Sequence, residues 1–452
     1  MRTTGKTISA CLFLCVLNLG CLADINTTTD KSTSGVVTLT GPHDVTASPV
    51  NSWATKGSLH SARQGQTTVR LHSGLVLTVG GYPGTLASAE LYNLATEAWS
   101  ITGSLHSGRN YHTATVLQDG KVLVVAGQTA ANPQGSTSAE LYDPTTGLWT
   151  NTGSLNVGRF WHTATLLPNG DVFVAGGTCG NGPLKSAEIY NATNGTWTTV
   201  LTTMSVTRDV HTATMLANGK VLLAGGTGMS GVQNTAELFD PSGNAGAGAF
   251  TTAHTFTGGR YNHTATLLAN GKVLITGGYD NVNAVASSSI YDPTGNAWSD
   301  SGNLNTGRYV HTATLLENGK VLASGGNDGN ASLDTSEIFD PGAGTWSTTH
   351  NFPNNLAIEG HSSTLLPNGE ILVTGGWNRT TEYKASYAFS VYAPITLAAT
   401  GGTSPYAYQL VAGTGLIDTN GYYWPLTAET AQVRVISEDG SSYDTLNVVT
   451  NP

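Results

Sequence analysis

The sequence predicts an all-β fold built from seven similar units of four strands each. Three observations lead to this prediction: a composition suited to short strands, a phrase that returns about every fifty residues, and a tight turn that recurs within the phrase. Of the 452 residues, 56 are Gly and only 11% are charged. Such a composition favours short strands joined by many turns over long helices.

The recurring phrase is clearest in the stretch that begins at Arg109. An Arg-x-x-His-Thr-Ala-Thr segment is followed there by an Asp-Gly turn, an apolar run that ends at a glycine, an Ala-Glu-Leu-Tyr-Asp-Pro segment and Trp149. The glycines that end the apolar runs are 46 to 52 residues apart: Gly81, Gly127, Gly177, Gly226, Gly278, Gly326 and Gly376. A fixed period of this length indicates a repeat architecture in which each unit is one supersecondary structure.

Each unit contains four strand-like segments. The first and second are joined by Asn-Gly or Asp-Gly in six units, a pair that tolerates the positive φ angles of a type I′ hairpin. The second segment, for example 221–224, is apolar at every position, so we expect it to be buried on both faces. Small sheets that stack face to face around an axis have such strands, which predicts a seven-bladed β-propeller.

The ends of the repeat region predict how the ring closes. The last unit has three strand-like segments and lacks a fourth one with a Trp, whereas Trp53 stands before the first unit. We expect the Trp53 strand to complete the seventh blade, because this removes an exposed sheet edge.

The Gly-Gly pairs, the aromatic residue near the third-strand Glu and the spaced Trp residues resemble kelch repeats over 51–394. The Arg-x-x-His-Thr-Ala-Thr phrase resembles kelch units of bacterial exported proteins and of galactose oxidase-like propellers. The resemblance implies a binding or scaffold module. Galactose oxidase-like enzymes hold copper with Tyr and His and use a His from the C-terminal domain, which 395–452 lack. We therefore expect no cofactor, and an enzyme of the sialic acid mutarotase type is the catalytic alternative.

The flanking segments predict export. Residues 1–23 are interpreted as a signal peptide, because Arg2 and Lys6 precede an apolar run too short to span a bilayer. Cleavage before Cys21 would leave a lipid anchor on that residue, whereas cleavage after Ala23 would leave the protein free, and both remain open. We expect a periplasmic, cell-surface or secreted protein without a transmembrane span.

Two further segments flank the predicted propeller. Residues 24–50 are rich in Thr, Ser and Asp and are expected to form a spacer, either without regular structure or with one extra strand at 36–39. Residues 395–452 alternate as strands and resemble a bacterial immunoglobulin-like or cadherin-like module, a small β-sandwich. The domain prediction is thus signal peptide, spacer, propeller over 51–394 and Ig-like domain.

Charge and cysteine content exclude several function classes. The formal net charge is −10 and no basic tract is present, which argues against nucleic acid as a partner. Cys179 stands alone after residue 23, so neither an internal disulfide framework nor a Cys-x-x-Cys metal motif is available. No nucleophile elbow, phosphate-binding loop or HExxH motif occurs.

Two charged series recur with the repeat. Arg63, Arg109, Arg159, Arg208, Arg260 and Arg308 begin the phrase, and a Glu recurs on most third strands. They are interpreted as buried ion pairs that lock each blade, with a cationic ring for an anionic ligand as the alternative. The seventh unit lacks both charges, and Ile358 and Ser390 are assigned to these two positions.

Six histidines recur in the phrase as well. They are expected to hydrogen-bond between blades, because equivalent positions on a ring lie too far apart to share one metal ion. We therefore predict no metal site.

One face of the predicted propeller is rich in aromatic residues. If the first and second strands are antiparallel, the segments before each phrase histidine and after each Gly-Gly pair lie on the same face. The candidate binding residues on this face are Tyr111, Phe160, Trp161, Tyr261, Tyr309, Tyr82, Tyr279, Trp377 and Asp328, alongside Asp209, Asp280 and Asn327. Aromatic rings beside amides and carboxylates suit sugars or peptide side chains.

These observations predict an exported module that binds a glycan or a protein and does no chemistry. Two alternatives remain: a small-sugar enzyme of mutarotase type, and a structural surface or matrix protein without a discrete ligand. Fold alone does not choose among them.

Overall fold

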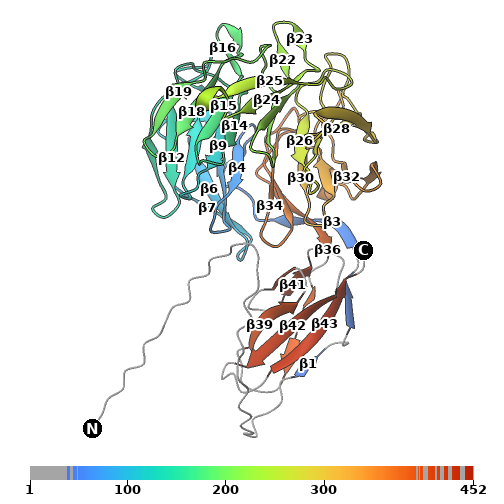
Figure 1. Ribbon diagram of the computed structural model, residues 1–452. Coiled ribbons are helices and arrows are strands. Elements are labelled where there is room, and N and C mark those ends of the chain that lie inside the picture. Colours follow the sequence, from blue (N-terminus) through green and yellow to red (C-terminus); the bar gives the residue numbers. More distant parts are fainter. Residues whose placement is uncertain are drawn as a thin grey trace, which may run out of the picture.

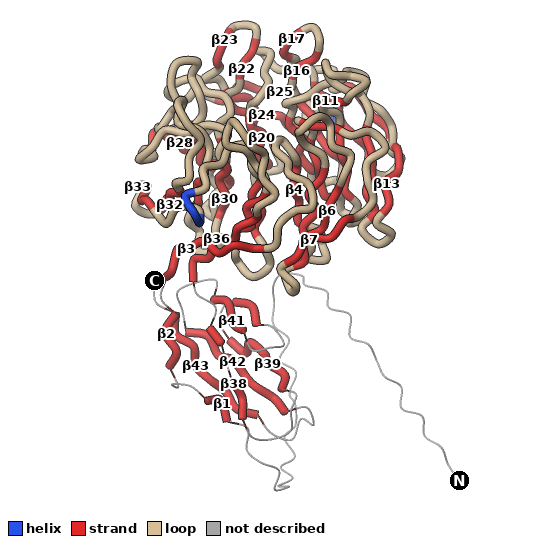
Figure 2. Tube along the Cα trace, turned by 180° about the vertical axis from the view of Figure 1, so that it is seen from behind, coloured by secondary structure: helices blue, strands red, loops and turns tan. Residues whose placement is uncertain are grey.

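The structure is a computed structural model, and it describes residues 38–40, 44–47, 49–392, 395–396, 398–400, 406–412, 415–417, 422–425, 430–437 and 443–450. The signal peptide, most of the predicted spacer and the candidate lipid anchor Cys21 lie outside the described residues. The described part is almost entirely strand and loop, with two single-turn 3-10 helices, Asn244–Gly246 and Pro353–Asn355 (Figure 2).

Seven four-stranded antiparallel sheets stand around a common axis (Figure 1). The first strands are β4 (Thr67–Arg70), β9 (Thr113–Val116), β14 (Thr163–Leu166), β20 (Thr212–Met215), β26 (Thr264–Leu267), β30 (Thr312–Leu315) and β34 (Ser362–Leu365). The second strands are β5 (Val76–Val79), β10 (Val122–Val125), β15 (Val172–Ala175), β21 (Val221–Ala224), β27 (Val273–Thr276), β31 (Val321–Ser324) and β35 (Ile371–Thr374). The first strands contact one another in sequence order, and β34 contacts β4, so the ring is closed.

The outer half of each sheet is formed by the third and fourth strands. The third strands are β6 (Ala89–Asn93), β12 (Ala139–Asp143), β18 (Ala187–Asn191), β24 (Ala236–Asp240), β28 (Ser288–Asp292), β32 (Ser336–Asp340) and β36 (Ser386–Tyr392). The fourth strands are β7 (Ala98–Ile101), β13 (Leu148–Asn151), β19 (Thr196–Thr199), β25 (Ala249–Ala253), β29 (Ala297–Ser301), β33 (Thr345–Thr348) and, in the seventh blade, β3 (Pro49–Lys56). The prediction of an all-β, seven-bladed propeller is confirmed.

The strand that contains Trp53 completes the seventh blade. β3 pairs antiparallel with β36, and Trp53 lies opposite Phe389 in the register. The Trp53 ring packs against Phe352 and Phe389 at centroid distances of 4.3 and 5.1 Å, and its indole N–H donates to the carbonyl of His350. The predicted closure by an N-terminal strand is therefore present.

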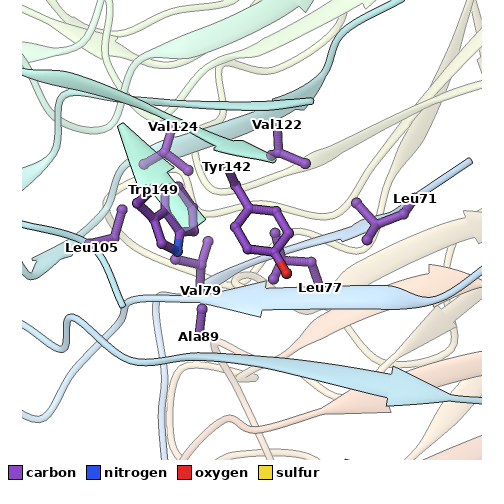
Figure 3. Packing of buried hydrophobic residues seen from close by; sticks show 9 residues of the cluster. All are labelled: Leu71, Leu77, Val79, Ala89, Leu105, Val122, Val124, Tyr142 and Trp149. Atoms are coloured by element: carbon purple, nitrogen blue, oxygen red, sulfur yellow. The ribbon is translucent and has the colours of Figure 1, made fainter. Parts of the chain in front are cut away.

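The hydrophobic core lies between neighbouring blades. Figure 3 shows one such cluster, in which Tyr142 and Trp149 of the second blade pack with Leu77 and Val79 of the first. Each of the seven clusters joins residues of two adjacent blades, and the second strands are buried at almost every position. A blade buries its apolar faces only against its neighbours, which is why the second strands lack polar alternation.

Short strand pairs stand on the rim where the second strands end. They are β8 (Arg109–Asn110) with β11 (Gln128–Thr129), β16 (Thr178–Cys179) with β17 (Gly182–Pro183), and β22 (Thr227–Gly228) with β23 (Gly231–Val232). The hairpins of β16 and β22 project at the top of Figure 1. The Asn-Gly turns lie on the opposite rim, because the first strands run away from the Gly-Gly end.

The described residues beyond the propeller form short sheets. β2 (Asp44–Ala47), β43 (Tyr443–Thr450), β42 (Thr430–Ser437) and β39 (Tyr406–Ala412) make one sheet, β37 (Ile395–Thr396), β41 (Tyr422–Pro425) and β40 (Gly415–Ile417) a second, and β1 (Thr38–Thr40) pairs with β38 (Ala398–Thr400). The segment expected to be a spacer thus contributes two strands that pair with C-terminal ones. No described helix is long and apolar enough to cross a membrane.

Candidate functional site

The phrase arginines are fully buried and hold the Gly-Gly corner of their own blade. Arg109 donates from Nη1 to the carbonyl of Ala126 at 2.8 Å and from Nη2 to Glu140 at 2.7 Å. Burial lowers the pKa of Arg109, and the Glu140 charge partly offsets the effect. Equivalent pairs join Arg63 to Glu90, Arg159 to Glu188, Arg208 to Glu237 and Arg308 to Glu337. The ion-pair interpretation is confirmed, because side chains with 0% exposure are closed to a ligand.

Two blades lack the Glu. In the fifth, Arg260 donates to the carbonyls of Gly277, Ser287 and Thr257, and burial lowers its pKa to about 10 while Asp300 acts in the opposite direction. In the seventh, Ile358 replaces Arg, and the register places Tyr387 opposite Val373, where five of the blades have Glu.

The assignment of Ser390 to this Glu position is therefore wrong by three residues. The Ser390 hydroxyl instead donates to Glu370. The seventh blade fills the ion-pair site with an apolar cluster, in which Ile358, Tyr387 and Phe352 are all buried.

The phrase histidines link each blade to the one before it. Nε2 of each histidine shares a hydrogen bond of 2.9 to 3.1 Å with a first-strand Thr hydroxyl of the preceding blade. The pairs are Thr67 with His112, Thr113 with His162, Thr163 with His211, Thr212 with His263, Thr264 with His311 and Thr312 with His361. In the first blade Gln66 takes this role by donating to the Thr374 carbonyl. The predicted bonding between blades is confirmed.

The residue just before each histidine position forms an inner ring. In every blade its backbone N–H donates to the carbonyl of the equivalent residue in the preceding blade, at 3.1 to 3.3 Å. These residues, termed here the ring residues, are Gly65, Tyr111, Trp161, Val210, Asn262, Val310 and Gly360. All have φ between 42° and 63°, a left-handed conformation that is unusual for valine.

The ring residues surround an axial cavity of about 550 Å³. All seven of them line it, together with Gln64, Gln66, Asp209, Thr227, Tyr261, Asn281, His311, Glu359, His361 and Trp377. Its wall includes Thr227 of β22, so the cavity reaches the rim from which the β22 hairpin rises. The volume falls within the ~300–1,000 Å³ of ordinary small-ligand sites.

The structure brings together some of the predicted binding residues and separates others. Tyr111, Trp161, Tyr261 and Trp377 line the cavity, and the Tyr111 and Trp161 rings lie 5.3 Å apart. Four others are not part of its wall: Phe160, which is buried under Trp161, and Tyr82, Tyr309 and Tyr279. Tyr279 packs between Tyr261 and Tyr309 at the side. Asp328 also lies outside the wall, where its carboxylate accepts the N–H groups of Asn330 and Ala331 in its own loop.

The cavity wall also contains polar groups, of which Asp209 was predicted on this face and Glu359 was not. Asp209 is 5% exposed, its Oδ1 has no hydrogen-bond partner, and burial raises its pKa to about 6. Glu359 is 7% exposed and accepts from Asn327 and Ser332. Burial lowers the pKa of His361 to about 3 and that of His311 well below its usual value, so both are neutral at pH 7. Aligning the residue before each histidine across the repeats would have identified the ring residues from sequence.

The side chains do not fit a copper or zinc site. Among the described residues, no group of three or more His, Cys, Asp or Glu side chains is placed to hold a metal ion. The six phrase histidines come from six blades, and each shares a hydrogen bond with a Thr of the blade before it. The thiol of Cys179 lies 3.7 Å from the carbonyl of Gly182 in its own hairpin.

Comparison with known proteins agrees with this architecture. A solved "novel fungal alcohol oxidase with catalytic diversity among the AA5 family, in complex with copper" matches with a TM-score of 0.63 and 16% identity, covering 88% of this chain and 100% of that one. The structure of YjhT matches with a TM-score of 0.51 and 15% identity, covering 65% of this chain and 99% of that one. At these identities the likeness shows the fold alone.

No curated protein sequence matches the chain significantly. The family model of the KLHDC2/KLHL20/DRC7 Kelch-repeats domain matches residues 111–300 and 210–394, which together exceed half of the chain. With seven blades, a Gly-Gly corner that recurs in them and this match, the chain belongs to the kelch-repeat family.

Proposed function

We propose that this protein is an exported binding module whose propeller takes a glycan or protein ligand in the axial cavity. One observation carries the proposal: a closed ring of backbone hydrogen bonds holds one residue of each blade at the same cavity, and these residues range from Gly and Val to Asn, Tyr and Trp. A rigid frame with variable side chains at equivalent positions is what a binding site requires. Kelch propellers typically serve as binding or scaffold modules.

The wall is asymmetric, which supports one bound orientation. At the ring-residue position, blades two and three have the aromatic side chains of Tyr111 and Trp161. Blades seven and one have Gly360 and Gly65 at this position, which carry no side chain. Trp161 is 40% exposed, although large aromatic side chains are usually more deeply buried. An exposed aromatic ring in a concave site is a common anchor for sugars and peptide side chains.

A small-sugar enzyme of the mutarotase type is the alternative. The observation that favours it is Asp209, a buried carboxyl group whose pKa of about 6 suits proton transfer near neutral pH. Anomer interconversion of a monosaccharide that is lost in Asp209→Asn would favour the enzyme.

The same proposal includes an export signal, followed either by a lipid anchor at Cys21 or by a free N-terminus. It also includes the Ig-like identity of the C-terminal strands. Propeller strand β3 begins and β36 ends on the rim opposite the cavity, since Pro49 pairs with Tyr392 there. This supports a role for the C-terminal strands as a base that leaves the cavity free. Mass spectrometry of the mature N-terminus distinguishes cleavage before Cys21 from cleavage after Ala23.

The binding proposal is tested with glycan and protein arrays and with three variants. Trp161→Ala removes the aromatic anchor, and Gly360→Trp adds a bulky side chain to the wall beside Gln64 and Trp377. Met229→Ser is the matched control, because Met229 is 80% exposed in the β22–β23 hairpin and does not line the cavity. We expect a ligand whose affinity falls at least tenfold in the first two variants and is unchanged in the third. If no array component binds in a Trp161-dependent manner, the proposal is wrong and the structural-protein alternative stands.

A further inference from the structure

We propose that the axial cavity recognises a protonated amino group on a sugar, so that the ligand is an oligosaccharide of deacetylated amino sugars. The proposal rests on the binding function above and names its ligand class. It follows from the charge of the wall, the hydrogen-bonding capacity left open on it, and the aromatic surface beside it.

The charged groups of the wall are carboxylates. Asp209 comes from the fourth blade and Glu359 from the seventh, and among the described residues that line the cavity there is no Lys or Arg. The phrase arginines do not line the cavity, because each is buried and hydrogen-bonded within its own blade. A wall of this kind repels phosphate, sulfate and carboxylate ligands and attracts cations.

The oxygen atoms of the wall that lack a hydrogen-bond partner can only accept hydrogen bonds. Glu359 already accepts from Asn327 and Ser332, and the Arg379 guanidinium lies 4.0 Å away. Asp209 Oδ1 and Gln66 Oε1 are buried and have no partner. Nδ1 of His311 and of His361 is also unpartnered, but a neutral ring nitrogen donates or accepts according to the tautomer. Buried acceptors without partners cost free energy that a ligand rich in donors recovers.

Asp209 shares the cavity wall with Trp161 of the preceding blade and Tyr261 of the next one. The backbone N–H of Val210, the next residue, donates to the carbonyl of Trp161 on one side. On the other side, burial raises the pKa of Tyr261, and Asp209 is one of the nearby groups that add to this shift. An ammonium ion held by a carboxylate and placed against Trp and Tyr rings gains both ion pairing and cation–π attraction.

The remaining wall favours a sugar over a basic peptide side chain. Amide groups of Gln64, Gln66, Asn262 and Asn281 and the hydroxyl of Thr227 are distributed around the cavity. A lysine side chain has one polar end and would leave most of these groups without a partner. A sugar ring has hydroxyl groups on its edge for the amides and an apolar face for Trp161.

The test compares two oligosaccharides that differ only at the amino group. Isothermal titration calorimetry measures the binding of a β-1,4-linked glucosamine tetramer and of the N-acetylglucosamine tetramer to the full chain. The pH is set below the pKa of the sugar amine and above the Asp209 pKa of about 6, so that the amine is protonated and Asp209 is a carboxylate. We expect the glucosamine tetramer to bind at least tenfold more tightly. We also expect Asp209→Asn, which keeps the side-chain shape, to reduce that affinity at least tenfold; Asp209→Ser is a second variant with the same expected loss.

The matched control is Asp119→Asn. Asp119 lies in the first-to-second-strand turn on the opposite rim, where five equivalent turns already have Asn, so the change removes one negative charge without altering the cavity. Circular dichroism and thermal unfolding confirm that each variant is folded. An affinity that falls equally in Asp119→Asn and Asp209→Asn would show a general charge effect and overturn the assignment.

Other outcomes separate this inference from the function on which it rests. Equal affinity for both tetramers, or no binding of either, overturns the amino-sugar assignment. The binding function survives that result if an array component binds in a Trp161-dependent manner. Tighter binding of a lysine tetramer than of the glucosamine tetramer overturns the sugar assignment and indicates a basic peptide.

Discussion

The backbone N–H of Gly65 in the first blade donates a hydrogen bond of 3.2 Å to the carbonyl oxygen of Gly360 in the seventh. This bond closes the inner ring, while the pairing of β3 with β36 closes the outer edge of the same junction. The two ends of the repeat region are therefore bonded both near the axis and at the outer edge. The cavity depends on these bonds because Gly65 and Gly360 line its wall.

The first prediction concerns this closure. Replacing Trp53 by Ala removes the ring that packs on Phe352 and Phe389 and the bond to the His350 carbonyl. We expect the free energy of unfolding to fall by about 2–4 kcal/mol, because large-to-small changes in packed sites cost that much. Urea unfolding followed by fluorescence measures the loss. Leu201→Ala is the control, since Leu201 is 80% exposed, and a loss as large in this variant would contradict the role of Trp53.

The second prediction uses the seventh blade as a template. Glu140→Gln leaves Arg109 buried without its counter-charge and is expected to cost about 3–5 kcal/mol. The triple variant Leu105→Phe, Arg109→Ile and Glu140→Tyr reproduces the apolar cluster of Phe352, Ile358 and Tyr387. We expect it to be more stable than Glu140→Gln in urea unfolding, because it removes the unpaired charge. A triple variant that is less stable would show that the ion pair cannot be exchanged for packing in that blade.

The third prediction concerns the loss of folding stability in acid that the phrase histidines cause. Burial and Arg109 lower the pKa of His112 to about 3, against about 6.5 in an unfolded chain. Between these values the unfolded chain binds a proton that the folded chain does not, so stability falls as pH falls below about 6.5. His112→Gln removes this contribution, and it introduces the residue type that the first blade already has at this position, Gln66. We expect wild type to lose about 2 kcal/mol relative to the variant between pH ~7 and pH ~5 in urea unfolding. A difference independent of pH would refute it.

The fourth prediction has the opposite sign. Burial raises the pKa of Asp209 to about 6, above its unfolded value of about 3.9, so the folded chain holds the proton more firmly. The contribution of Asp209 to stability therefore declines as pH rises from about 4 to about 6 and stays low above that. We expect Asp209→Asn to be more stable than wild type at pH ~8, on the order of 1–3 kcal/mol, with the gain vanishing near pH ~4. Thermal unfolding at both pH values measures it, and a gain that persists at low pH would refute the pKa shift.

Much of the fold could be predicted from sequence because the blades are locally encoded. The hairpin turns, the apolar second strands and the phrase arginines all lie within one repeat of about fifty residues. They recur at equivalent positions in most of the other repeats. The position of Trp53 was predictable as well, since the last repeat lacks a fourth strand. The error at Ser390 arose where the repeat is degenerate and only strand pairing, which places Tyr387 opposite Val373, defines the register.

The cavity could be predicted only in part. The aromatic residues were predicted on the rim that the cavity reaches, but Phe160 and Trp161 are adjacent in sequence and were predicted to be equivalent. The left-handed backbone at Trp161 places its side chain on the axis, while Phe160 enters the core. Residues without an aromatic ring, such as Asp209 and Glu359, gave no signal of comparable strength.

The sequence by itself determined the number of blades, the strands within each blade and the pairing of Arg with Glu, because these depend on contacts inside one repeat. Tertiary structure alone decided which residues meet on the axis, since they come from seven blades and approach one another only after the ring has closed. A cavity built this way depends on closure, and no single repeat contains enough of its wall to reveal the ligand that it fits.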